Sequence, residues 1–275
     1  MSLNKSRKFK VVKRRVFAHS LSLALNRLKT HFGASSVKLS TEDAGMSFEQ
    51  IRFWIEICQG VLPVIVKIGG PNARNDIKQC LDLGADGLIA PMVESAYGLE
   101  NFISALKDYA TPIKLASLKK QINIETVVAI QNLPEILSHP EIEFLDEITI
   151  GCSDLSQSMK KSRLDPEVRA LVKDTVTQIR ARGIPVSLGG GISPATIDSI
   201  LSEVQPNQFN TRVVTFQVQP GTSFRPAVEE SLRFELSMLK SDVKNGFMSK
   251  EEEVFRAREL RKRLESSRQK CHSAI

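Results

Sequence analysis

The sequence is poor in cysteine and has no long apolar run. Its 275 residues include four cysteines, with no CxxC pair and no spacing typical of a zinc site. Scattered thiols of this kind indicate reduced cysteines in a cytoplasmic protein. No apolar stretch is long enough to span a membrane, and no hydrophobic signal core follows the basic N-terminus. We therefore expect a cytoplasmic protein with no membrane partner. The cysteines are Cys58, Cys80, Cys152 and Cys271.

Two further absences limit the binding partners. No GxGxxG motif follows the first expected strand, which argues against a dinucleotide-binding fold. The net charge is +7 at pH 7, but much of the excess lies near the two ends, within residues 5–15 and 256–270. These ends lack the interleaved aromatic residues of single-stranded nucleic-acid binders. Their mixture of acidic and basic residues favours a solvent-exposed helix with many ion pairs, so we expect no nucleic-acid partner.

Strand-like and helix-like segments alternate from residue 37 onward. Nearly continuous β-branched strands separated by amphipathic helices are typical of a parallel sheet covered by helices on both faces. The expected strands are 37–41, 63–69, 87–92, 121–125, 147–152, 184–188 and 208–216, with an extra strand or connector at 113–116. The expected helices are 48–58, 75–83, 96–109, 127–138, 166–182, 194–202, 226–246 and 250–269.

This order predicts an α/β fold, a (β/α)8 TIM barrel with additional C-terminal helices. An eighth strand near residues 10–18 would complete the barrel, although residues 16–32 also fit a helix. A doubly wound open sheet is the alternative. The length suits a single domain over residues 1–275, with a basic N-terminal segment at 1–15 and C-terminal helices at 226–275.

Two of the expected strands deliver a carboxylate at the rim where barrel chemistry takes place. Glu125 ends one strand, and Asp154 follows the next. Two carboxylates on one rim suit Mg²⁺ or Mn²⁺, which bind through one or two carboxylates and keep positions for water and substrate oxygens. The alternative is that both acids only cap the helices that follow them.

Several segments, in this order, give the chain a family resemblance. It resembles the HpcH/HpaI aldolase and citrate lyase beta-subunit family, within the phosphoenolpyruvate/pyruvate barrel group, over about residues 37–218. The long middle segment has Leu-Gly-Ala and Pro-Met-Val elements, and the later Glu and Asp-Leu-Ser motifs make the combination more specific. The matching segments are Thr41-Glu42-Asp43-Ala44, residues 77–94, Ile122-Asn123-Ile124-Glu125-Thr126, and Ile150-Gly151-Cys152-Ser153-Asp154-Leu155-Ser156.

The resemblance implies a divalent cation held by Glu125 and Asp154. In the family such a cation polarises the carbonyl of a 2-oxo acid such as pyruvate and stabilises the enolate formed on carbon–carbon cleavage or addition. Backbone amides of Gly151, Cys152 and Ser153, at the start of a helix, would then hold the substrate carboxylate.

The chain departs from the family at two positions. In the aldolase branch of the family the base is a histidine. Asp43 stands at that position here, so the local pattern resembles the citrate lyase branch. The family arginine that pairs the substrate carboxylate aligns with Lys67, a point charge in place of a bidentate fork. Arg74 or Arg212 could substitute for that arginine. Glu42 and Asp43 are candidates to orient water or to act as acid and base.

Some of these residues have simpler interpretations. Asp43 could cap the helix that begins near Ser47, and Lys67 could form an ion pair with Glu42 or Glu94. A lysine inside the barrel could also form a Schiff base with a carbonyl substrate, although paired carboxylates would then lack a purpose; the candidates are Lys67, Lys114 and Lys38.

Two other features have weaker functional interpretations. Cys152 beside the proposed metal site is expected to be an inert small hydrophobe. The loop Gly189-Gly190-Gly191-Ile192-Ser193 could cradle a phosphate, or three glycines could simply make a tight turn.

The sequence thus predicts a metal-dependent carbon–carbon lyase or aldolase acting on a 2-oxo acid or acyl-CoA thioester. The alternatives are a thioester- or phosphoester-processing barrel of the same ancestry and a non-catalytic ligand-binding homologue. The amphipathic C-terminal helices need cover, and family members often exchange their last helix with a neighbouring subunit. We therefore expect a homo-oligomer built through residues after about Pro226.

Overall fold

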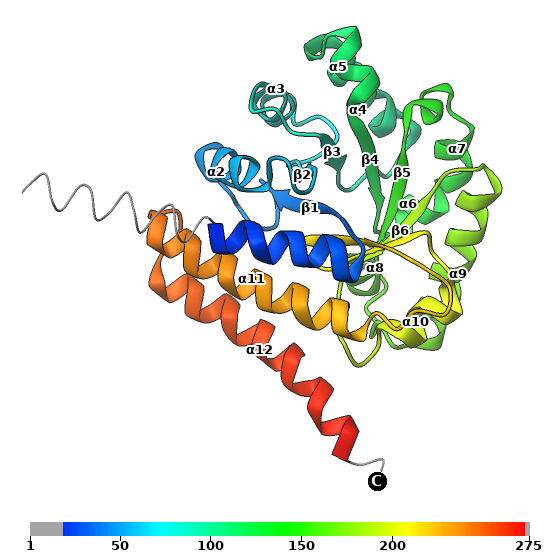
Figure 1. Ribbon diagram of the computed structural model, residues 1–275. Helices are drawn as coiled ribbons and strands as arrows, with labels where there is room; N and C mark the ends of the chain where they lie inside the picture. The colour runs from blue at the N-terminus through cyan, green and yellow to red at the C-terminus, as the bar shows by residue number, and fades with distance from the viewer. Residues whose placement is uncertain (1–18, 273–275) are drawn as a thin grey trace, which may run out of the picture.

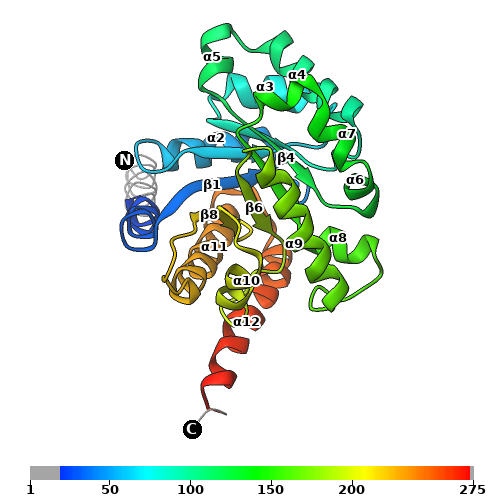
Figure 2. The same cartoon turned by 90° about the vertical axis from the view of Figure 1, so that its right-hand side faces the viewer.

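Eight strands close into a barrel in chain order in the computed structural model, which describes residues 19–272. Helices surround these strands (Figures 1 and 2). The fold is therefore the expected α/β barrel. The strands are β1 (Ala34–Ser40), β2 (Val64–Lys67), β3 (Gly87–Ala90), β4 (Lys119–Ile124), β5 (Glu147–Gly151), β6 (Val186–Gly189), β7 (Gln208–Asn210) and β8 (Val214–Gln217).

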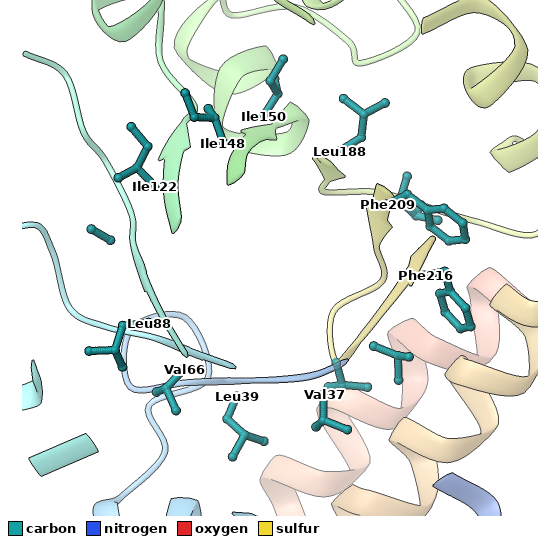
Figure 3. Close-up of a cluster of buried hydrophobic side chains, with 14 of the residues drawn as sticks. Val37, Leu39, Val66, Leu88, Ile122, Ile148, Ile150, Leu188, Phe209 and Phe216 are labelled. Carbon is teal, nitrogen blue, oxygen red and sulfur yellow. The ribbon is translucent and has the colours of Figure 1, made fainter. Parts of the chain in front are cut away.

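The two-residue period of the strands sorts apolar from polar side chains. Figure 3 shows one set of apolar side chains pointing outward from the barrel, toward the helices. Val37 and Leu39 of β1 and Val66 of β2 belong to this buried core. The residues that alternate with them along the strands, including Lys38 and Lys67, point in the opposite direction, into the barrel. The inside of the barrel therefore holds charged side chains.

The last expected strand, 208–216, is in fact two strands. β8 pairs antiparallel with both β7 and β1, whereas β1 to β7 pair with their neighbours in parallel. Thr211 reverses the chain because its N–H donates to Val214 O at 2.9 Å and its hydroxyl accepts from Val214 N at 3.1 Å. The expectation of a single strand here, and hence of an all-parallel barrel, was wrong.

The expected strand at 10–18 lies outside the described residues. Residues 19–32 form a helix, in agreement with the alternative for that segment. β8 closes the barrel by pairing with β1, with Val37 opposite Val214.

The helices between the strands match expectation closely, with four differences. The segment expected at 127–138 is two helices that meet at Asn132, residues 113–116 lie in a helix, a short 3₁₀ helix precedes β5, and a short helix follows β5 directly. The helices are α2 (Phe48–Cys58), α3 (Arg74–Asp82), α4 (Ala96–Tyr109), α5 (Pro112–Ser117), α6 (Val127–Gln131), α7 (Leu133–Ser138), η1 (Pro140–Phe144), α8 (Cys152–Ser158), α9 (Pro166–Ala181) and α10 (Ile197–Val204). Within residues 19–272, no helix is both long enough and apolar enough to cross a membrane.

Two C-terminal helices, α11 (Arg225–Asn245) and α12 (Lys250–His272), pack side by side, and the end of α12 extends away from the barrel (Figures 1 and 2). α12 touches two loops at the C-terminal ends of strands. Arg256 donates to Ala44 O at 3.0 Å, after β1, and Arg263 donates to Ile192 O, after β6. The C-terminal helices therefore cover part of the barrel mouth within one chain.

Candidate active site

The loop after β1 carries two of the expected site residues. The backbone N–H groups of Glu42 and Asp43 donate to the Ser40 hydroxyl at 3.2 and 3.1 Å, which fixes the loop at the mouth. The alternative that Asp43 caps α2 is wrong, because Ser47 is the N-cap and accepts from Gln50 N at 3.2 Å. Asp43 instead faces basic side chains.

Lys67 ends β2 with its ammonium group between these acids. Its Nζ lies 2.6 Å from Glu42 Oε2 and 3.9 Å from Asp43 Oδ1, and the residue is only 7% exposed. Burial alone would lower the pKa of Lys67, but Asp43 and the hydrogen bond to Glu42 outweigh it and raise the pKa. Glu94, the other expected partner, accepts instead from Thr126 Oγ1 at 2.6 Å. Lys67 is thus a stable cation paired with Glu42.

Asp43 is held between two cations. Its Oδ2 lies 3.8 Å from Arg212 Nε, and Arg212 Nη2 is 3.4 Å from Asp43 O. Burial acts to raise the pKa of Asp43, but Lys67, the Ser40 hydrogen bond and further cations lower it. Arg212 also lies 3.8 Å from Glu235 Oε1, a buried carboxyl of α11 whose pKa is raised by burial. Arg212 thus joins the group at the mouth, as expected.

Arg74, the other expected substrate-binding arginine, has different neighbours. Its guanidinium pairs with Asp108, and its Nε lies 3.4 Å from Tyr109 Oη, both near the end of α4. Its Cζ also stacks 5.2 Å from the Tyr109 ring centre. The structure therefore places Arg212, and not Arg74, beside Asp43 and close to Lys67.

Glu125 follows β4 and is 2% exposed. Its Oε1 accepts from Met92 N at 2.9 Å, and its Oε2 accepts from Asn123 Nδ2 at 3.1 Å. Met92 adopts a φ of 55°, a strained conformation for a non-glycine residue that aims its N–H at this carboxylate. Burial raises the pKa of Glu125, Lys67 opposes that effect, and Asp154 adds to it. The carboxylate is fixed in place, and a further positive charge would stabilise its ionised form.

Asp154 lies in the first turn of α8, after β5, and is exposed. Glu125 and Asp154 follow β4 and β5, which are neighbouring parallel strands, so both residues lie at the same rim of the barrel. Among residues 19–272, no three His, Cys, Asp or Glu side chains cluster as a ready metal site. Mg²⁺ is usually held by only one or two carboxylates with water and substrate oxygens, so this hard oxygen pair fits such a cation.

The segment Gly151–Ser153, expected to bind the substrate carboxylate, starts α8. A Cβ on Gly190 would lie 2.6 Å from Ser153 N, so only glycine lets the loop after β6 approach this turn so closely. Burial raises the pKa of Cys152 to about 12, so it is a thiol and not a nucleophilic thiolate. The raised pKa agrees with the inert character expected for Cys152. Binding of the substrate carboxylate by the backbone amides of Gly151–Ser153 stays a prediction.

Three lysines were candidates for a Schiff base, and they differ in position. Lys114 donates to Ala85 O at 2.7 Å, away from the acids at the mouth, and Lys67 is a paired cation. Lys38, inside the barrel, is close enough to Lys67 and Glu125 to interact with both, and burial and Lys67 lower its pKa.

Sequence reasoning missed a second buried acid inside the barrel. Glu147 begins β5, is buried, and has hydrogen-bonding partners in Ser187 and Thr149. Burial raises the pKa of Glu147 to about 7. Alternation with the outward-facing Ile148 was the signal that could have placed it inside.

An α/β barrel with carboxylates and a lysine gathered at the C-terminal ends of its strands has the organisation of a barrel enzyme. Residues 42–189 match the sequence profile of the HpcH/HpaI aldolase/citrate lyase family. The chain belongs to this family.

Individual relatives agree with this assignment. A 2-keto-3-deoxy-L-rhamnonate aldolase of Salmonella paratyphi B (strain ATCC BAA-1250 / SPB7) is 32% identical over 44% of this chain and 52% of the relative. A 2-dehydro-3,6-dideoxy-6-sulfogluconate aldolase of Pseudomonas putida is 27% identical over 53% of this chain and 64% of the relative. The chain spans about half the length of the first relative and less than two thirds of the second.

A solved structure shows the same fold. It is that of an HpcH/HpaI aldolase/citrate lyase family protein from Burkholderia cenocepacia J2315. It aligns with a TM-score of 0.56 at 14% identity and covers 68% of this chain and 90% of that chain.

Proposed function

We propose that this chain is a carbon–carbon lyase or aldolase that acts on a 2-oxo acid or an acyl thioester, with Mg²⁺ or Mn²⁺ bound by Glu125 and Asp154. The observation that carries the proposal is that these two acids follow the C-terminal ends of β4 and β5, which are neighbouring parallel strands of the barrel. A divalent cation there would polarise the substrate carbonyl and offset the charge that develops on its oxygen.

The cationic side chains at the mouth are assigned to substrate binding. Lys67 stays protonated because of its acidic neighbours, and Arg212 reaches the same group from the β7–β8 turn. Together they supply the charge that the family arginine provides, and a planar guanidinium can grip a carboxylate with two hydrogen bonds. The amides of Gly151, Cys152 and Ser153 would complete the carboxylate site.

Asp43 is assigned to proton transfer, at the position of the family histidine. Lys67 and Arg212 keep its pKa low, so it is in the proton-accepting form at neutral pH. In the cleavage direction it would take the proton of the substrate hydroxyl and then give a proton to the enolate carbon, which becomes the methyl group of pyruvate. The reverse of this second transfer would exchange the methyl protons of pyruvate. Glu42 fixes the Lys67 ammonium beside it.

The assembly and location are part of the same proposal. We infer a cytoplasmic homo-oligomer with contacts through the C-terminal helices. Support comes from the exposed apolar residues Val254 and Phe255 on α12, which are 54% and 73% exposed.

The proposal is tested first by cation binding. The melting temperature of the protein is measured with Mn²⁺ or Mg²⁺, with and without oxalate, an enolpyruvate mimic. We expect stabilisation by the cation that oxalate increases, because a ligand of the folded state stabilises it. Glu125→Gln and Asp154→Asn should abolish the shift, whereas Glu143→Gln, an exposed acid of η1, should retain it.

The proposed proton transfer is tested with pyruvate in D2O. Exchange of the pyruvate methyl protons, followed by NMR, reports proton abstraction without any need to know the second substrate. We expect cation-dependent exchange that Glu125→Gln slows at least about hundredfold. The proposal is wrong if Mn²⁺ and Mg²⁺ leave the melting temperature unchanged in the presence and absence of oxalate.

A further inference from the structure

A cavity of about 390 Å³ lies outside the barrel, between α9 and α10. Its walls are largely apolar and include Val168 and Val172 of α9 and Ile200 and Val204 of α10. This volume lies in the range of pockets that bind small molecules. Cavities with apolar walls and a few convergent polar groups are typical of ligand sites.

The lining of the cavity carries more basic than acidic side chains. Its lining contains three guanidinium groups and a single carboxylate, Glu203, which already pairs with Arg169. Arg163 lies over Gly191, where a Cβ would come within 1.0 Å of its Nη1, and its Nη1 donates to a neutral group, Ser153 Oγ, at 3.4 Å. The cavity therefore carries an excess of positive charge.

Arg263 brings a further charge from α12. Burial lowers the pKa of Arg263; Glu235 opposes that effect, and the nearby Arg163 and Arg212 add to it. Arg263 is half-buried and Arg163 is exposed. These like charges repel one another, and an anion between them would relieve that repulsion. Arginine is also the side chain that best matches carboxylate and phosphate oxygens.

The cavity borders the candidate active site. Cys152, at the start of α8, lines it two residues before Asp154. Gly190 also lines it and touches the Ser153 backbone closely. A molecule in the cavity would therefore contact the same turn of α8 that carries Asp154.

We propose that this cavity is a second binding site, for a molecule with a carboxylate or phosphate group on an apolar body. The anionic group lies between Arg163 and Arg263, and the apolar body lies between α9 and α10. The inference stands on the cavity alone and does not depend on the proposed lyase activity.

The test uses three probes with the same apolar body: hexanoate, hexyl phosphate and hexanol. Their affinities for the whole chain are measured by NMR titration. We expect at least one anion to bind about tenfold or more tightly than hexanol, because each charge-assisted hydrogen bond strengthens binding. Comparison of hexanoate with hexyl phosphate then identifies the preferred anionic group.

Two variants separate charge from location. Arg163→Gln should weaken the favoured anion about tenfold and leave hexanol unchanged. Ile200→Phe, which places a larger side chain in the cavity, should weaken all three probes. Arg233→Gln is the matched control, since Arg233 lies on α11 and pairs there with Glu229 and Glu230. Melting curves establish that each variant is folded.

The inference is overturned if hexanol binds as tightly as both anions, or if Arg163→Gln or Ile200→Phe binds the anions like the unaltered chain. Oxalate with Mn²⁺ is titrated into the unaltered chain as well. If the unaltered chain binds oxalate with Mn²⁺ but binds neither anionic probe more tightly than hexanol, only the cavity inference is removed. Normal probe binding without any oxalate or cation effect removes only the lyase proposal.

Discussion

Gly151 leaves room for the Glu125 carboxylate. A Cβ at residue 151 would lie 2.3 Å from Glu125 Oε2 and 2.6 Å from Glu125 Cβ. These two residues come from the ends of neighbouring strands, β5 and β4, so the absence of one side chain permits the position of the other. This relationship makes a glycine as important to the proposed cation site as the acid itself.

Gly151→Ala is therefore expected to displace Glu125. The crowding should lower stability by about 1–3 kcal/mol and abolish the Mn²⁺-dependent rise in melting temperature. Gly189→Ala on β6 is the control, because its Cβ would meet Thr149 Cγ2 at an ordinary 3.6 Å. A normal response to Mn²⁺ in Gly151→Ala would contradict the geometry proposed for the site.

Lys67→Met should change the acid limb of the pH–rate profile. Lys67 lowers the pKa of Asp43, so Asp43 stays ionised below its ordinary range in the unaltered chain. Without the ammonium group that pKa should rise, and pyruvate exchange should fail at a higher pH than before. Lys67→Arg keeps the charge and should leave the acid limb near its original position. An unshifted limb in Lys67→Met would remove Asp43 from proton transfer.

Glu147→Gln is expected to stabilise the protein as the pH rises. The pKa of Glu147 is raised from 4.5 to about 7, so the folded state binds more protons than the unfolded state between these values. Stability therefore falls across this range, as the buried carboxyl ionises. The neutral glutamine avoids that cost. Relative to the unaltered chain, its free energy of unfolding should therefore gain about 3 kcal/mol between pH 4 and above pH 8. Urea unfolding of both proteins at the two pH values measures this difference. A difference in the free energy of unfolding that does not change with pH would contradict the prediction.

Leu260→Ala tests whether α12 stabilises the mouth from within the same chain. Leu260 is buried, and its truncation should cost about 2–4 kcal/mol. We expect this loss at protein concentrations where the chain is monomeric by sedimentation. Val254→Ala, on the same helix but exposed, should cost less than about 0.5 kcal/mol. Equal, small effects of both substitutions would mean that α12 is not anchored by its own chain.

Much of the fold could be predicted because local signals agree with the tertiary structure. Helices α2 and α4 begin and end where expected, since Ser47 and Ser95 cap them and their apolar faces repeat at helical spacing. The turn between β7 and β8 was missed because Thr211-Arg212-Val213 has none of the Gly, Pro, Asn or Asp residues that mark turns. Its hydrogen bonds depend on a threonine hydroxyl that has no special pattern in sequence.

The candidate site was predictable only in part, for a related reason. Glu125 and Lys67 stand out as polar residues at the ends of apolar strands, and both reach the mouth. The neighbours of Arg74 depend on α4, more than thirty residues later in the chain, and no spacing rule reveals them. Lys38 and Glu147 become notable only when the barrel closes and places their side chains among other charges.

The reversed direction of β8 removes one of the loops that a fully parallel barrel would place around its catalytic opening. The chain returns to the opposite end after Gln217, where Gln217 N reaches Gly33 O, before α11 starts. α11 brings Glu235 back to Arg212, and α12 then runs from Ala44 to Ile192. Substitutions along this terminal hairpin of helices can thus reshape access for substrates while leaving the strand ladder intact. Diversification of specificity among close homologues is expected to concentrate there.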